Sequence, residues 1–439
     1  MARAAERMGF RVHLAGAAAL LALAVWLSSG TMAPYASTYG GSLATKPCGY
    51  LVNIDQPHHE AVFQMLDGQP RAHWEKSVVL RRLLFPLLAY PFMKVGGYLA
   101  GGFVASLLCQ LAGLLALALH LRRRHGEAAA IAGSWLYATY PGITYWAGLP
   151  YAYVAIVPAS IALYILLVRL DERRRLAAVA GIGGAMGLLF TAYDLAPFFG
   201  VAAVFLLLAR RRYLEIPLAV ATMAAAPLAA LLLLKLAFAA PLVNANTAIY
   251  GTVLRAYLHP PGLGAWLRSV SDFPVVLVEN FLFSNMLFLP LGFLLMAALA
   301  VRRLAPSETA LLGAVALVFL FNNLAPPYAG RWQMRGDLMP RLYQPLFVVL
   351  LVYCARALGD WRSLPGARGQ LLLAAALFTF AGNATIAFGP VARVPWAGTI
   401  YHLFYRHSPA STMDENLARY GRRPLGLCDR SLSGSARTP

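Results

Sequence analysis

The sequence predicts an all-helical protein that crosses a membrane about eleven times, and three observations carry this prediction. The 439 residues are 59% hydrophobic and only 13% charged, whereas soluble domains carry about 25% charged residues because water must solvate their surface. Uncharged apolar runs recur along the chain, and several approach the roughly 20 residues that span a hydrocarbon core of about 30 Å. Arginines stand in short clusters between these runs, at 122–124, 173–175, 210–212 and 302–303.

The net charge of +19 does not indicate a nucleic-acid-binding protein. Short basic clusters between apolar runs are the distribution that the positive-inside rule predicts for cytoplasmic loops. Anionic lipid headgroups are therefore the expected counter-charge, and nucleic acid is excluded as a partner.

The first predicted helix covers residues 11–30 and runs outward from a cytoplasmic N-terminus. Its basic start, apolar run and following Ser28-Ser29-Gly30 also fit a cleavable signal peptide. We expect an uncleaved helix, because multi-spanning proteins rarely need a removable signal.

A polar outer loop follows at 31–82, and then an interrupted apolar segment at 83–98. Pro86, Pro91 and Lys94 interrupt this segment. If it crossed the membrane, every later helix would invert and the arginine clusters would face outward. The positive-inside rule therefore predicts a helical segment that lies at the outer interface or only dips in.

The remaining spans then alternate across the membrane, with an arginine cluster at each cytoplasmic turn. The expected helices lie near 100–121, 128–146, 150–169, 175–192, 195–210, 214–239, 281–301, 308–325, 341–358 and 369–391, and the tail 392–439 lies outside.

Titratable groups concentrate on the predicted outer side. Eleven of the 18 carboxylates and six of the nine histidines fall there. Proton-transfer chemistry needs such groups, although water-facing loops are polar in any case. Cys109 and Cys354 fall inside helices as packing residues, whereas Cys48 and Cys428 both lie outside and could form a disulfide in an oxidising compartment.

Three stretches resemble the GT-C superfamily of membrane glycosyltransferases, which use lipid-linked sugar donors. A carboxylate after the first helix (NIDQPHHE, 53–60) is followed by arginines and a proline-punctuated helix (RRLLFPLLAYP, 81–91). The run GLPY at 148–151 is similar to a turn in bacterial relatives of the GPI mannosyltransferases, although Ala152 replaces their acidic residue. The third stretch, MRGDLMPRLYQP at 334–345, has Arg and Tyr separated by Leu342, where many members have them adjacent.

The resemblance implies a GT-C-like transmembrane core at 1–240 with its first outer loop at 31–98. It also implies a variable C-terminal transmembrane module at 241–391, and an active site between the first outer loop and the membrane.

Transfer from a polyprenyl phosphate needs a base that removes the proton of the acceptor. A carboxylate at the membrane interface can do this, and inversion at the sugar needs only one such group. Asp55 is the predicted catalytic residue and Glu60 is the reserve. Asp55 before Pro57 also fits a helix cap, and the two roles can coexist.

The leaving phosphate calls for guanidinium donors at the outer membrane level. The predicted donor-binding residues are Arg81, Arg82, Arg335, Arg341 and Tyr343. Outer arginines depart from the positive-inside trend, so a lipid phosphate is one reason for them. Pairing with Asp337 or with headgroups is the other.

Four further residues are candidate acceptor or sugar contacts: His58, His59, Tyr151 and Asp194. Asp194 lies alone between two apolar helices, which marks either a functional acid or a plain loop residue. A divalent metal at His58, His59, Glu60 and Asp55 stays open as an alternative. Adjacent histidines diverge by about 100° on a helix, and neither HExxH nor a cysteine pair supports zinc, so no metal ligand and no cofactor is assigned.

The sequence therefore predicts an inverting glycosyltransferase of the inner, cytoplasmic membrane that acts on the extracytoplasmic face. Its expected partners are a polyprenyl-phosphate sugar, a glycan, lipid or protein acceptor, and the membrane. A lipid or glycan transporter or flippase is an alternative, although the two halves of the chain show no mutual similarity. A noncatalytic GT-C-like assembly partner, suggested by Ala152, and a ligase for assembled glycans are the others.

Overall fold

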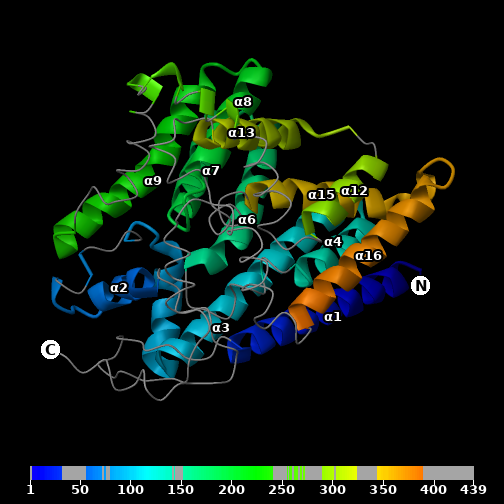
Figure 1. Cartoon of the computed structure of the whole chain (residues 1–439), viewed down its shortest axis with the longest axis horizontal. Helices are drawn as coiled ribbons and strands as arrows, with labels where there is room; N and C mark the ends of the chain where they lie inside the picture. Colours follow the sequence, from blue (N-terminus) through cyan, green and yellow to red (C-terminus); the bar gives the residue numbers. More distant parts are fainter. Residues whose placement is uncertain are drawn as a thin grey trace.

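The structure is a computed structural model that describes residues 2–31, 56–71, 74–75, 80–140, 143, 152–240, 255, 257–259, 262–264, 267–268, 270–271, 289–300, 303–323 and 344–388. The regular secondary structure of this part of the chain is helical, and the part contains no strand (Figure 1). The helices are α1 Ala2–Thr31, α2 Gln56–Leu66, α3 Leu84–His125, α4 Glu127–Ala138, α6 Ile156–Glu172, α7 Leu176–Phe190, α8 Ala196–Ala209, α9 Glu215–Phe238, α12 Leu289–Ala300, α13 Pro306–Asn323, α15 Gln344–Gly359 and α16 Arg368–Phe388, with short 3₁₀ turns η2 Ala152–Ala155 and η5 Trp361–Ser363.

The all-helical prediction is confirmed over these residues. Among the described residues, four segments are long and apolar enough to cross a membrane: Gly9–Trp26, Gly101–His125, Ala152–Glu172 and Glu215–Phe238. Shorter apolar helices accompany them, among them α7, α8 and α15. The count of about eleven spans and the outward placement of the tail stay predictions.

The interrupted apolar segment 83–98 forms the first part of α3. After this part, α3 folds back on itself. A Cβ added at Gly101 would overlap the carbonyl group of Phe92. Nine residues of a straight helix would separate these positions by about 13 Å, so the chain turns sharply between them. The apolar arm Leu84–Gly96 is about 20 Å long, shorter than a hydrocarbon core of about 30 Å. This length fits the predicted interfacial placement, which stays a prediction.

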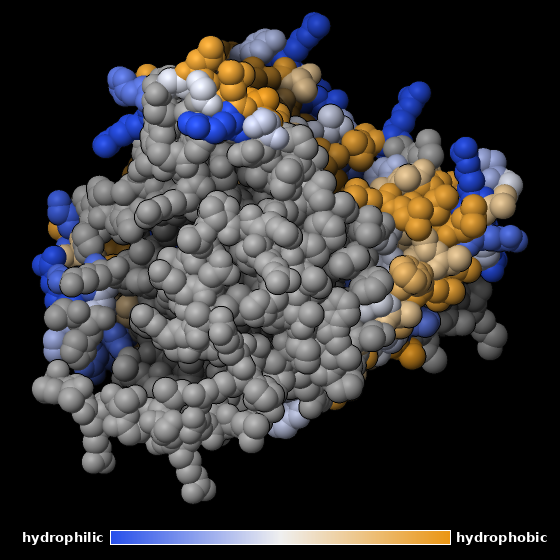
Figure 2. Space-filling view, in the orientation of Figure 1, coloured by the Kyte–Doolittle hydropathy of each residue, from blue (hydrophilic) through white to orange (hydrophobic). Residues whose placement is uncertain are grey.

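Helix α6 lies at the centre of the bundle. It packs against α3, α7, α8, α13 and α15, and α15 also packs against α4 (Figure 1). Helices from the two predicted transmembrane modules are therefore in direct contact. Apolar side chains are exposed on the side of the molecule where α12 and α16 lie (Figure 2), including Leu294, Leu377 and Phe378. An apolar outer surface is the one that lipid solvates.

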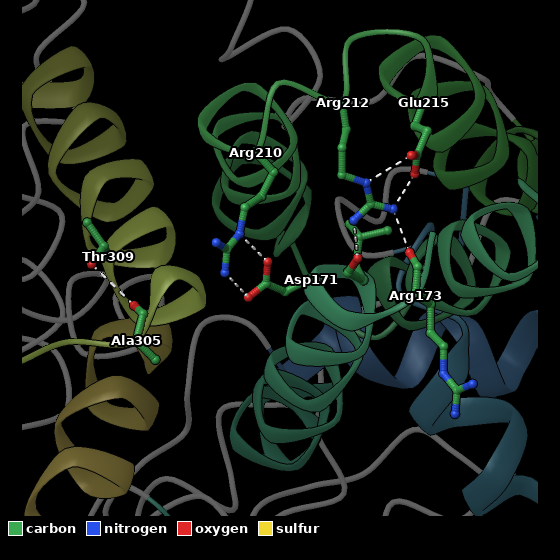
Figure 3. A network of polar contacts seen from close by, with 8 residues as sticks. Asp171, Arg173, Arg210, Arg212, Glu215, Ala305 and Thr309 are labelled. Atoms are coloured by element: carbon green, nitrogen blue, oxygen red, sulfur yellow. Dashed lines mark hydrogen bonds and ion pairs between the residues drawn. The ribbon is translucent and has the colours of Figure 1, made fainter. Parts of the chain in front are cut away.

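Two of the arginine clusters that the sequence places on one side, 173–175 and 210–212, lie next to each other in space (Figure 3). Asp171, at the end of α6, pairs with Arg210, at the end of α8, at 2.6 Å. Arg212 pairs with Glu215 at the start of α9 and donates to the carbonyl of Leu170 at 2.6 Å. These ion pairs gather the ends of three helices into one polar face.

Two glycines of α7 let α9 approach closely. A Cβ added at Gly183 would overlap the hydroxyl of Thr222, and one at Gly187 would overlap the carbonyl of Met223. Small residues four positions apart are the usual means by which membrane helices bring their backbones together. The pair therefore fixes α9 to the edge of the bundle.

We expect Gly187→Leu to lower the stability of the purified protein by about 1–3 kcal/mol, because the added side chain must displace the backbone of α9. The thermal midpoint in detergent measures the loss. Gly184→Leu is the matched control, since nothing lies within 4 Å of an added Cβ there. Equal midpoints for the two variants would contradict the close α7–α9 contact.

Candidate functional site

Three of the predicted site residues are described with their side chains, and the structure brings them together. Arg81, Arg82 and Asp194 form one group, which we call the Arg81–Arg82–Asp194 cluster. The predicted residues outside the described part of the chain are Asp55, Tyr151, Arg335, Arg341 and Tyr343, as are Cys48 and Cys428 of the predicted disulfide. His58, His59 and Glu60 lie in α2, but their side chains are not described.

Asp194 is shared by the two arginines. Arg82 Nη2 donates a hydrogen bond of 2.6 Å to Asp194 Oδ2. Arg81 Nη2 lies 2.6 Å from Asp194 Oδ1. That second contact is an ion pair without the angle of a hydrogen bond, so Arg81 Nε and Nη2 are buried with no hydrogen-bond partner, as is Arg82 Nε. Buried guanidinium donors without acceptors are uncommon and ask for an explanation.

The local fold explains why these residues meet. Asp194 occupies the turn between α7 and α8, and the arginines lie directly before α3. The backbone N–H of Leu84 donates to the carbonyl of Thr191 at 3.2 Å, which joins the two segments. Each segment thus positions the other, across 112 residues of sequence.

Two tyrosines pack against Arg82. Its guanidinium carbon lies 4.1 Å from the ring centroid of Tyr193 and 5.9 Å from that of Tyr153. The two rings meet edge to face at 5.6 Å. Guanidinium groups are attracted to aromatic faces, so Arg82 is held by a carboxylate on one side and by π-faces on the other.

A buried polar chain places Tyr153, which belongs to η2. Tyr137 donates from its hydroxyl to Gln110 Oε1 at 2.8 Å, and Gln110 Nε2 donates to the carbonyl of Val154 at 2.7 Å. All of these groups are buried. Sequence reasoning missed Gln110 and Tyr137, although a glutamine within an apolar helix is a visible signal.

The electrostatics keep the cluster ionised. Burial by itself raises the pKa of Asp194, but the charges of Arg82 and Arg81 outweigh it, and the pKa lies below its usual value. Burial acts against the charge of Arg82, yet Asp194 and the two tyrosines raise the pKa of that guanidinium overall. Two positive charges and one negative charge leave the cluster with a net charge of about +1 at neutral pH.

Helix α2, which carries Glu60, packs beside this cluster. Its buried residues Ala61, Val62 and Met65 contact a small apolar group that includes Leu80 and Leu83, the neighbours of the two arginines. At the other end of α2, Asp67 accepts hydrogen bonds from Tyr90 at 2.6 Å and Lys94 at 2.8 Å. Helix α2, which carries the reserve base Glu60, is therefore fixed against the segment that holds the two arginines.

The Arg81–Arg82–Asp194 cluster lies at the opposite end of the bundle from the polar face that holds Asp171 and Arg210. Tyr153 precedes α6, whereas Asp171 lies at the end of α6, and 17 residues of helix separate the two ends by about 25 Å. Among the residues whose side chains are described, no group of three or more histidine, cysteine or acidic residues could hold a metal ion. Since His58, His59 and Glu60 fall outside that set, the divalent-metal alternative stays open.

No protein-family model matches the chain, and no curated protein matches its sequence. Among solved structures, the fold is similar to the crystal structure of ArnT from Cupriavidus metallidurans bound to undecaprenyl phosphate. The similarity covers 98% of this chain and 88% of that chain, with 13% sequence identity and a TM-score of 0.44. A likeness of this strength does not assign a function to the chain.

Proposed function

We propose that the chain is a GT-C-type glycosyltransferase. It moves a sugar from a polyprenyl-phosphate donor to an acceptor on the extracytoplasmic face of the inner membrane, with inversion at the sugar. The observation that carries the proposal is the Arg81–Arg82–Asp194 cluster, which combines a net positive charge with buried guanidinium donors that lack hydrogen-bond partners. Such donors suit the oxygens of a phosphate.

The chemistry assigns separate roles to Asp55 and to the arginines of the first outer loop. The acceptor hydroxyl attacks the anomeric carbon while the bond from that carbon to the phosphate oxygen breaks. Asp55 takes the hydroxyl proton, and the electron pair of the broken bond leaves with the polyprenyl phosphate. Arginines stabilise the charge that develops on the leaving phosphate. The packing of α2 against Leu80 and Leu83 supports a common site for both groups.

Arg335, Arg341 and Tyr343 complete the proposed donor site, with His58, His59 and Tyr151 as proposed contacts for the acceptor or the sugar. The same proposal treats 1–240 as the GT-C-like core and 241–391 as its variable module. Ala152, buried in η2, leaves no acid at the position where relatives of the GPI mannosyltransferases have one. The proposed base is therefore a carboxylate of the first outer loop, Asp55 with Glu60 in reserve.

Reconstitution tests the proposal. Purified protein in liposomes is given polyprenyl-phosphate sugars that carry radiolabel in the sugar, with and without EDTA. We expect the label to move from the lipid to an acceptor, with loss of the bond between sugar and phosphate. Label that crosses the bilayer on an intact lipid would instead identify a flippase, and no change with any donor would favour an assembly partner. Dependence on EDTA decides whether a divalent metal takes part.

A further inference from the structure

We propose that Asp194 and Arg82 are positioning residues, which hold the guanidinium of Arg81 where it contacts the phosphate group of the lipid donor. This inference rests on the proposed function and gives the three residues of the cluster different roles. Arg81 binds the ligand, whereas Arg82 and Asp194 form the buried anchor behind it.

The two arginines differ in how firmly they are held. The side chain of Arg82 is 8% exposed, hydrogen-bonded to Asp194 and packed over Tyr193. The side chain of Arg81 is 21% exposed, and its ion pair with Asp194 lacks hydrogen-bond geometry. Arg81 Nε and Nη2 donate no hydrogen bond, so Arg81 can turn them toward the oxygens of a phosphate. Arg82 cannot move without losing both its hydrogen bond to Asp194 and its packing over Tyr193.

Asp194 is poorly suited to a direct chemical role. Both of its carboxylate oxygens are engaged, Oδ1 by Arg81 and Oδ2 by Arg82. A carboxylate held by two guanidinium groups is also a weak base, in line with the lowered pKa of Asp194. The predicted contact between Asp194 and an acceptor or a sugar would require it to release one of these partners.

The charge balance explains why an acid belongs at this place. Adjacent arginines repel each other, and the repulsion grows where water is excluded. One shared carboxylate allows both guanidinium groups to be buried side by side. The remaining charge of about +1 matches the single negative charge of a phosphodiester donor.

The anchor is also tied to the frame of the protein. Asp194 lies in the α7–α8 turn, where the carbonyl of Thr191 accepts the N–H of Leu84 at the start of α3. The phosphate-binding arginine thus takes its position from the transmembrane helices as well as from its own loop. Such support from rigid elements is what a binding residue needs to be held accurately.

Binding measurements on the full-length protein in nanodiscs test the division of roles. The probes are farnesyl phosphate and inorganic phosphate. We expect Arg81→Gln and Asp194→Asn each to weaken farnesyl phosphate binding about tenfold or more. The double variant should be no weaker than either single variant, because both changes remove the same interaction. Asp194→Glu, which keeps the charge, should recover part of the affinity.

Asp171→Asn is the matched control, since it removes a carboxylate that bridges helix ends at the far face of the bundle. It should leave farnesyl phosphate binding unchanged. In the transfer assay, Asp194→Asn should raise the KM for the lipid donor and leave the KM for the acceptor unchanged. A thermal midpoint for each variant separates loss of the fold from loss of binding.

Several outcomes would overturn the inference. Wild-type binding by Asp194→Asn, together with loss of binding by Arg81→Gln, would remove the positioning role and leave the proposed function standing. Additive losses in the double variant would show that the two residues act separately. Binding of inorganic phosphate without farnesyl phosphate would exclude a lipid ligand. Failure of the wild-type protein to transfer any sugar would instead count against the proposed function.

Discussion

Asp55→Asn should abolish sugar transfer while the protein keeps its fold and its affinity for lipid phosphate. The amide has the shape of the carboxyl group but cannot accept the proton of the acceptor hydroxyl. General-base catalysis contributes about 10²–10⁴-fold to a rate, so turnover should fall by at least two orders of magnitude. Turnover of the purified variant in liposomes, beside its thermal midpoint, measures the effect.

The first outer loop supplies matched controls for this experiment. Glu75 is half-exposed and forms an ion pair with Arg71 four residues earlier, so Glu75→Gln should transfer sugar at the rate of the wild type. Glu60→Gln tests the reserve base on α2. Near wild-type turnover by Asp55→Asn, with loss in Glu60→Gln, would move the base to Glu60. Full activity in both variants would remove the carboxylate mechanism.

Helix positions could be predicted well from the sequence, because the apolar runs end at charged clusters. The expected helices at 175–192, 195–210 and 214–239 correspond to α7, α8 and α9 within two residues at each end. Water solvates the arginines and lipid solvates the runs, so composition alone fixes these boundaries. The return of α3 between Phe92 and Gly101 could be anticipated only as an interruption, since its direction depends on packing.

The candidate site could also be predicted only in part from the sequence. Arg81 and Arg82 could be proposed as phosphate ligands because outer arginines are unusual, and Asp194 because an isolated acid between apolar helices is unusual. Their meeting could not be predicted, since it depends on how α3, α7 and α8 pack. The structure turns two separate expectations into one ion-paired group. A useful signal, in retrospect, is that all three residues were expected on the same side of the membrane.

Glu308 shows where the sequence interpretation was too simple. The predicted topology places it among the seven carboxylates of the cytoplasmic side, which are expected to be ordinary loop charges in contact with water, but it is fully buried. The reason is local as well as tertiary. Glu308 is the third residue of α13 and accepts the N–H of Ala305 at 2.7 Å. A glutamate at the third position that reaches back to the start of its helix is a known capping pattern, and Pro306 at the first position strengthens it.

The second large effect is expected at this residue. Glu308 Oε1 lies 3.2 Å from Arg356 Nη1, which joins α13 to α15, and it also accepts a hydrogen bond from Tyr164 of α6. Glu308→Ala leaves the largely buried Arg356 without a counter-charge, and breaking a buried pair in this way costs about 3–5 kcal/mol. The thermal midpoint and the yield of folded protein in detergent should both fall sharply.

A double variant separates the cost of an unpaired charge from the value of the pair. Glu308→Met combined with Arg356→Met removes both charges and fills the space with apolar atoms, so it should recover most of the stability that Glu308→Ala loses. Asp171→Asn breaks a more exposed pair at the same face of the bundle and should cost less than about 1 kcal/mol. If the double variant were as unstable as Glu308→Ala, the ion pair itself would hold α13 against α15, rather than the packing around it.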